Sequence, residues 1–179
     1  AVPLPGDARI IDGTDRYLIP GLAEMHAHIP GRRSSEQWLD DVLILYLASG
    51  ITTARGMLGE PAHLELRDRI ARYERLGPRI YTSGPSLNGS SVDGPEDARR
   101  QVREQAAAGY DFLKLHPGLS RAEYDAIAET ARDTGIPFAG HVSVDVGLAR
   151  SLEAGQAAID HLDGYLDALV PADTPLPAT

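Results

Sequence analysis

The sequence predicts an α/β fold, and within that class an incomplete (β/α)8 barrel of about six βα units. Short apolar and β-branched runs alternate with helical patterns along residues 18–170, and short loops join them. Because parallel neighbours need a crossover helix, this alternation indicates a parallel sheet, either doubly wound or closed into a barrel. The candidate metal ligands favour the barrel. They follow the first, fourth, fifth and sixth predicted strands, whose ends converge on one mouth in a barrel but spread along an edge in an open sheet.

The first half of the chain predicts three strands joined by two helices. An apolar strand lies within residues 18–28, and Pro20–Gly21 breaks the chain at its start. The helix that follows is expected between a pair of serines able to cap it and Gly50. Its apolar stripe consists of Trp38, Val42, Leu45 and Tyr46. The other elements of this half are a strand at 51–54, a helix from Pro61 to before Gly77–Pro78, and a strand at 79–83.

The second half continues the same alternation. Pro95 and the two acids behind it begin a helix, because proline loses no useful hydrogen bond in a first turn and acids there favour the helix dipole. Ser120 and Glu123 have the capping-box spacing for the next helix. The remaining elements are expected as strands at 111–115, 137–141 and 157–161 and a helix at 146–154.

His26 and His28 end the first strand. Side chains alternate across a strand, so these two imidazoles project to the same face, about 7 Å apart along the chain. Two imidazoles placed in this way can bind one metal ion. The alternative is a strand with two ordinary histidines near its end, and the ligand-like residues that follow the later strands favour the metal interpretation.

Taken together, these motifs resemble the amidohydrolase superfamily of metal-dependent hydrolases. The resemblance is greatest to the branch that has a lysine in the metal site, which includes prolidase-like and imidazolonepropionase-related enzymes. The segments that carry it are Ile11–Thr14, Tyr17–Leu22, Glu24–His28, Phe112–Leu115, Gly140–Ser143 and Ile159–Leu162. The resemblance implies a TIM barrel over residues 18–170, preceded at 1–17 by the end of a small N-terminal β-sandwich. The proline-rich stretch 171–179 is expected to be a loop or frayed end.

The resemblance also implies a binuclear site with two divalent metal ions, zinc being the preferred element. His26 and His28 would bind one ion, His141 and His161 the other, and a carboxylated Lys114 would bridge them. Lys114 lies in an apolar strand, where an unpaired ammonium is costly and burial favours a neutral amine able to capture carbon dioxide. A lysine that reaches solvent at the strand end, or pairs with an acid, is the alternative.

Two further histidines have weaker assignments. His116 follows Lys114 by two residues and is a candidate for substrate binding at the same mouth, or else an ordinary loop residue beside Pro117–Gly118. His63 falls in the first turn of the second helix and is expected to be exposed to solvent.

The implied reaction is cleavage of an amide or related C–N bond, in a peptide-like or cyclic amide substrate, by a metal-activated hydroxide. The family's proton-transferring aspartate follows strand eight, so the catalytic acid/base is expected beyond Thr179 and stays unassigned. Without that strand the chain is expected to be poorly active alone. A non-catalytic metal-binding α/β module that completes its barrel with another chain, or binds one, is the alternative function.

Composition excludes several partners. The net charge of −9 argues against nucleic acid and anionic membranes, and no apolar run approaches the roughly 20 residues of a membrane span. The absence of cysteine excludes a disulfide framework and leaves localisation open between the cytoplasm and export after signal removal. Open barrel edges are expected to allow self-association. The partner that the resemblance implies is a small amide or peptide-like molecule.

Overall fold

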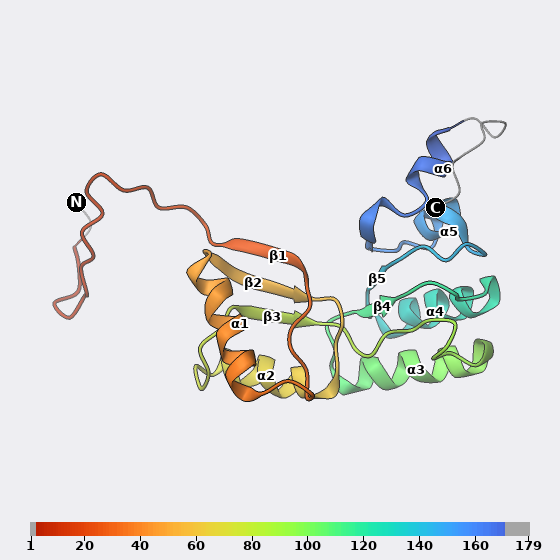
Figure 1. Cartoon of the computed structure of the whole chain (residues 1–179), viewed down its shortest axis with the longest axis horizontal. Coiled ribbons are helices and arrows are strands. Elements are labelled where there is room, and N and C mark those ends of the chain that lie inside the picture. Colours follow the sequence, from red (N-terminus) through yellow and green to blue (C-terminus); the bar gives the residue numbers. More distant parts are fainter. Residues whose placement is uncertain (1–2, 171–179) are drawn as a thin grey trace.

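The computed structural model describes residues 3–170 as an α/β fold in which strands and helices alternate along the chain (Figure 1). The strands are β1 (Leu22–Ala27), β2 (Ile51–Gly56), β3 (Arg79–Thr82), β4 (Leu113–Leu115), β5 (Phe138–Gly140) and β6 (Ala158–Ile159). The helices are α1 (Glu36–Ala48), α2 (Pro61–Ala71), α3 (Gly94–Ala108), α4 (Arg121–Thr134), α5 (Gly147–Glu153) and α6 (Tyr165–Leu169). A 3-10 turn, Asp160–Leu162, follows β6. The predicted strands and the helices between them are confirmed, and α6 is an addition.

All strand pairings are parallel and follow the order of the chain. Strands β1, β2 and β3 form one sheet, and β4, β5 and β6 form another. Parallel bridges between Ser83 and Phe112 and between Leu87 and Leu115 connect the two. Beyond β6 the chain returns to β1, because His26 Nδ1 lies 3.6 Å from Asp160 Oδ1. The six strands therefore form a curved series in which side chains at the carboxyl ends of the first and last strands come into contact.

Capping side chains fix where the helices begin. Ser35 accepts a hydrogen bond from the backbone N–H of Trp38 at the start of α1. At the start of α4, Ser120 and Glu123 form both bonds of the predicted capping box. Such caps satisfy N–H groups that have no partner inside the helix.

Alternation of side chains along the strands divides the core into two layers. On the helix-covered side, Leu113 and Leu115 join a cluster with residues of α3 and α4, and a second cluster packs α1 and α2 onto β2 and β3. On the opposite side, Phe112 packs with Met57 and Ala139. Lys114 has the same parity as Phe112 and shares its face of the sheet.

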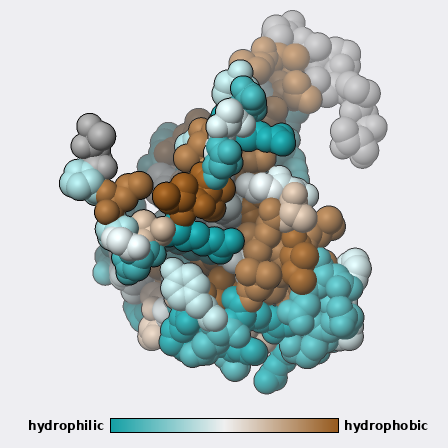
Figure 2. All heavy atoms as spheres, turned by 90° about the vertical axis from the view of Figure 1, so that its left-hand side faces the viewer, coloured by the Kyte–Doolittle hydropathy of each residue, from teal (hydrophilic) through white to brown (hydrophobic). Residues whose placement is uncertain are grey.

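The predicted apolar stripe of α1 is only partly correct. Leu43 is the residue of this helix that is fully buried, with Leu39 and Tyr46 packed beside it. Trp38 is 56% exposed and Leu45 is 65% exposed, so the stripe expected from spacing points partly into solvent. The helix rests on the sheet through a face rotated from the predicted one. On the side that Figure 2 turns toward the viewer, apolar side chains gather at the surface.

The segment before β1 contains no strand between residues 3 and 21, and it runs away from the sheets as an exposed chain (Figure 1). The β-sandwich remnant expected at residues 1–17 therefore stays a prediction. The proline-rich tail at 171–179 lies outside the described residues. Within residues 3–170, no helix is both long and apolar enough to cross a membrane.

Candidate metal centre

The carboxyl end of β1 brings two histidines into one cluster of imidazoles. The ring centroids of His26 and His28 are 5.3 Å apart, and the backbone N–H of His26 donates to Glu24 Oε1. Partial burial lowers the pKa of His26, against the opposing effect of the nearby Asp160 carboxylate. Burial thus favours the neutral imidazole, which is the form that binds metals.

Lys114 is fully buried in the middle of β4, and its Nζ donates to Asp160 Oδ2. The side chain of Asp160 is only 3% exposed, so this is a buried ion pair. Pairing with an acid was one of the two alternatives for an unmodified Lys114. A buried pair of this kind leaves an uncompensated charge when either partner is removed.

Asp160 and His161 reach the cluster through the turn that follows β6. The predicted strand at 157–161 ends early, because β6 stops at Ile159 and His161 has φ 53°, in the left-handed region. In a regular strand neighbouring residues point to opposite faces. The turn instead lets the carboxylate of Asp160 and the imidazole of His161 both face His26, with the two rings 4.8 Å apart.

His141, just after β5, completes the series of rings. Its centroid lies 5.1 Å from that of His161, and its Nδ1 is 2.8 Å from Asp163 Oδ2. A carboxylate on one ring nitrogen fixes the orientation of an imidazole and leaves its other nitrogen available.

His116 lies against His141, with the ring centroids 5.0 Å apart and the planes 25° from parallel. Its Nδ1 is hydrogen-bonded to the hydroxyl of Ser86. Burial, assisted by the positive charge of Lys114, lowers the pKa of His116 to about 4. The ring is therefore neutral at pH 7.

The predicted ligands thus occupy one place. His26, His28, His141 and His161 form a connected group of rings, and Lys114 joins them through Asp160. Ligand atoms of His26, Asp160 and His161 all lie within 4.8 Å of one another, a spacing that could hold a metal ion.

A model of the amidohydrolase family matches residues 17–174. The chain belongs to this family. Among curated proteins, this amidohydrolase chain is 26% identical over 168 residues to an adenine deaminase from Ruegeria pomeroyi, covering 87% of the chain and 28% of the deaminase.

Solved amidohydrolase structures share the fold. A bottromycin amidohydrolase superposes with a TM-score of 0.71 at 28% identity, covering 86% of this chain and 35% of that one. A prolidase complexed with N-methylphosphonate-L-proline gives 0.71 at 21% identity, covering 89% of this chain and 51% of that one. The amidohydrolase chain therefore spans between about a quarter and a half of the length of these relatives.

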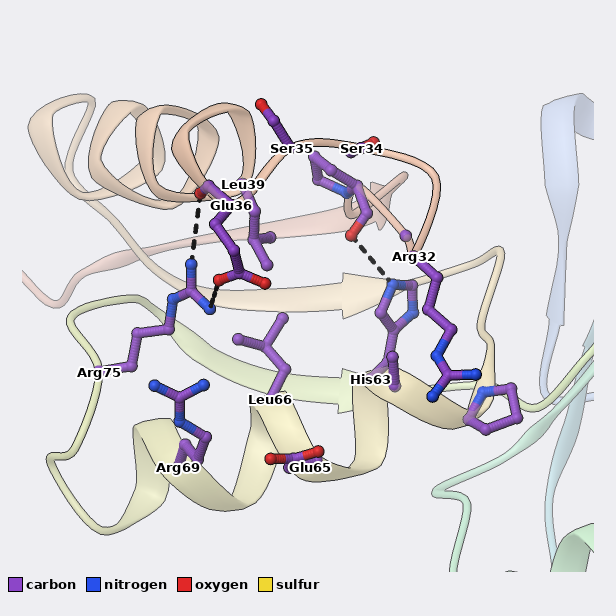
Figure 3. A pocket seen from close by; sticks show the side chains of 14 residues that line it. Arg32, Ser34, Ser35, Glu36, Leu39, His63, Glu65, Leu66, Arg69 and Arg75 are labelled. Carbon is purple, nitrogen blue, oxygen red and sulfur yellow. Dashed lines mark hydrogen bonds and ion pairs between the residues drawn. The ribbon is translucent and has the colours of Figure 1, made fainter.

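The amidohydrolase chain also has a cavity of about 390 Å³ between α1 and α2, shown in Figure 3. His63 lies in its wall and is 2% exposed, with its Nε2 3.3 Å from the backbone oxygen of Pro30. The expectation that His63 is exposed to solvent is wrong, because the loop after β1 covers the first turn of α2. On the other wall Arg75 pairs with Glu36 (Figure 3). None of the predicted ligands lines this cavity, which belongs to the packing of the two helices.

Sequence reasoning missed Asp160, Asp163 and Ser86 as members of the site. Asp160 precedes His161, and the assumption of a regular strand sends it to the opposite face. Asp163 follows strand six too closely to be the strand-eight acid, and the sequence suggests no other role for it, yet it supports His141. For Asp160 and Asp163, the available signal was their position beside His161, the candidate ligand at the end of strand six.

Proposed function

We propose that this chain carries the metal-binding part of a hydrolase that cleaves an amide or related C–N bond. The observation that carries the proposal is the meeting of the five predicted ligands, from β1, β4, β5 and β6, in one cluster of contacts. The names of the relatives, a deaminase, an amidohydrolase and a prolidase, agree with C–N chemistry. They do not favour the alternative of a non-catalytic module.

The fold supports the proposal as part of a (β/α)8 barrel over residues 18–170. The parallel strands pair in chain order, and side chains at the carboxyl ends of β1 and β6 come into contact, as side chains at the mouth of a barrel do. The inner face still holds a largely apolar cavity of about 310 Å³, lined among others by Met25, Phe112 and Ala139. Two further βα units between β6 and β1, from the same polypeptide or another, would fill and close it.

The donor set fits divalent ions such as zinc. His26 with His28, and His141 with His161, supply imidazole pairs, and Asp160 supplies a carboxylate within reach of His26 and His161. When bound, such ions act as Lewis acids and lower the pKa of a coordinated water. The chain's own contribution is orientation: Asp163 holds the ring of His141, and Glu24 holds the backbone of His26.

Lys114 would bridge the ions as a carbamate. Its neutral amine would attack carbon dioxide, forming an N–C bond while one C=O π bond opens to leave a negative charge on oxygen, and the nitrogen would lose one proton to solvent. The product is an anion beside the carboxylate of Asp160, and two adjacent anions repel. Carboxylation is therefore expected only when cations occupy the cluster. Without cations, Lys114 is expected to stay unmodified and paired with Asp160.

The test is metal analysis of protein prepared with zinc, with about two ions expected per complete barrel. The double variant His26→Ala, His28→Ala should lose at least one of them. His63→Gln is the matched control, because it removes a histidine outside the cluster. A stoichiometry unaffected by the double variant would exclude the site.

A further inference from the structure

The loop after β3 is fixed against the loop that carries His116. The backbone N–H of Leu87 donates to the oxygen of Lys114, and the N–H of His116 donates to the oxygen of Leu87, both at 2.9 Å. Farther along, a Cβ on Gly89 would lie 2.2 Å from the backbone oxygen of Gly118, so the two loops touch where only glycine fits. Ser86 and Asn88 are thereby held at a defined position beside the imidazole of His116.

The orientation of the Asn88 amide follows from its neighbours. Its Oδ1 accepts hydrogen bonds from the backbone N–H groups of Ser90, at 2.8 Å, and Ser91, at 3.1 Å. Both partners are donors, so the atom facing them must be the oxygen. The Nδ2 group consequently faces the other way, 3.5 Å from Ser86 Oγ.

This orientation sets the direction of the hydrogen bond to His116. An amide NH2 group can only donate, so Ser86 Oγ accepts from Asn88. Ser86 has one hydroxyl hydrogen, and because the Asn88 amide group that faces it can only donate, Nδ1 of His116 is the one partner of Ser86 Oγ within residues 3–170 that can accept that hydrogen. Nδ1 is then the acceptor, and a neutral imidazole that accepts at Nδ1 carries its hydrogen on Nε2.

We propose that Asn88 and Ser86 are positioning residues that hold His116 as the Nε2–H tautomer, so that this ring donates a hydrogen bond to a substrate oxygen. The ring lies on His141, at the rim of the histidine cluster. In that form Nε2 has no free lone pair, which excludes it as a metal ligand or a general base. The substrate would carry a carbonyl or carboxylate oxygen beside the C–N bond, and this last step rests on the proposed function.

The direct test reads the tautomer in the unmodified chain. Long-range proton–nitrogen NMR of histidine-labelled protein at neutral pH distinguishes a protonated from an unprotonated ring nitrogen, and His116→Gln identifies the signals by their loss. We expect the hydrogen on Nε2. A hydrogen on Nδ1 would overturn the proposal without any further variant.

Asn88→Asp is designed to reverse the tautomer. One carboxylate oxygen can still accept from the N–H groups of Ser90 and Ser91, but the other can no longer donate to Ser86. The Ser86 hydrogen then turns to the carboxylate, and Oγ accepts from Nδ1–H of His116. Ser90→Ala is the matched control in the same loop, because the Ser90 hydroxyl makes no hydrogen bond within residues 3–170. An unchanged tautomer in Asn88→Asp would show that this pair does not position the ring.

The substrate role is tested separately, in the longest natural form of the protein loaded with zinc. Loss of one donor to a reacting oxygen commonly lowers turnover about 100-fold or more, so Ser86→Ala, which only frees the ring to rotate, should lower kcat/KM about 10-fold with unchanged metal content. Unaltered kcat/KM in Ser86→Ala would overturn the substrate role. If the unmodified enzyme binds zinc but hydrolyses no amide, the proposed function fails while the tautomer result still stands.

Discussion

Helix α4, in the middle of the chain, and helix α1, near its start, use similar apolar stripes with opposite results. On α4, Tyr124, Ile127 and Ala131 are at most 2% exposed. On α1, Trp38 and Leu45 are more than half exposed. The difference lies in their neighbours: α4 packs against α3 and β4, whereas part of the stripe of α1 faces solvent.

Helix α6, at the other end of the strand series, exposes apolar side chains as α1 does. Leu166 and Leu169 of α6 are 75% and 78% exposed. Apolar stripes on helices normally mark the faces that are buried. Exposed apolar surface therefore concentrates at the two ends of the strand series, where two further βα units would pack in the proposed barrel.

The largest expected effect is at the ion pair that connects the middle of the sheet to its β6 end. Lys114→Ala leaves the buried carboxylate of Asp160 unpaired, and breaking such a pair lowers the free energy of unfolding by about 3–5 kcal/mol. Urea unfolding measures the change. The double variant Lys114→Met, Asp160→Leu should recover much of the loss. If it is as unstable as Lys114→Ala alone, an unpaired charge is not the cause.

The second largest effect is a difference in stability between substitutions on α4 and on α1. Ile127→Ala removes a fully buried side chain and should lower the free energy of unfolding by about 2–5 kcal/mol. Leu45→Ala removes one that is 65% exposed and should change it by about 0.5 kcal/mol or less. Equal losses in matched urea titrations would show that the face of α1 is buried in solution.

Such burial would come from self-association of the chain through the exposed face of α1. Trp38→Lys with Leu45→Lys places two charges on the exposed face of α1 and should shift the chain toward monomer. Size-exclusion chromatography with light scattering measures the mass. Tyr73→Lys, at a residue 96% exposed after α2, is the control. An unmodified chain that is already monomeric at high concentration would contradict the prediction.

The smallest effect concerns Asp97 in the first turn of α3. Hydrogen bonds from the backbone N–H of Asp93 and from Arg100 lower the pKa of its carboxyl from 3.8 to about 2. A carboxyl whose pKa is lower in the folded state stabilises the fold above its unfolded pKa and loses that effect as the pH falls. Asp97→Asn should therefore unfold slightly more easily than the unmodified chain at about pH 6 and equally at about pH 1, below both pKa values. A difference that persists at the lower pH would assign the effect to packing.

The sequence was sufficient to predict the strands and the helices between them, because Pro61, Gly50 and the Ser120–Glu123 pair mark their ends by local chemistry. It could not predict α6, whose five residues follow a left-handed Gly164 and carry no helical period. The burial of His63 was equally inaccessible, because it depends on a loop that crosses from β1.

For the site, the sequence identified the residues that converge but not the groups that support them. His26, His28, Lys114, His141 and His161 follow from strand ends, which a parallel sheet brings together. Asp160 depends on the left-handed backbone of His161, and periodicity gives no indication of such a turn. Ser86 depends on contact between two loops.

The contact between Gly89 and Gly118 has a consequence for the evolution of this protein. Any side chain at position 89 would collide with backbone, and position 118 has φ 95°, which favours glycine. Selection for a new substrate can alter the neighbouring loop residues, but a change at either glycine separates the two loops. Orthologues with different specificities are therefore expected to keep both glycines, while the residue at the exposed position of Ser90 varies.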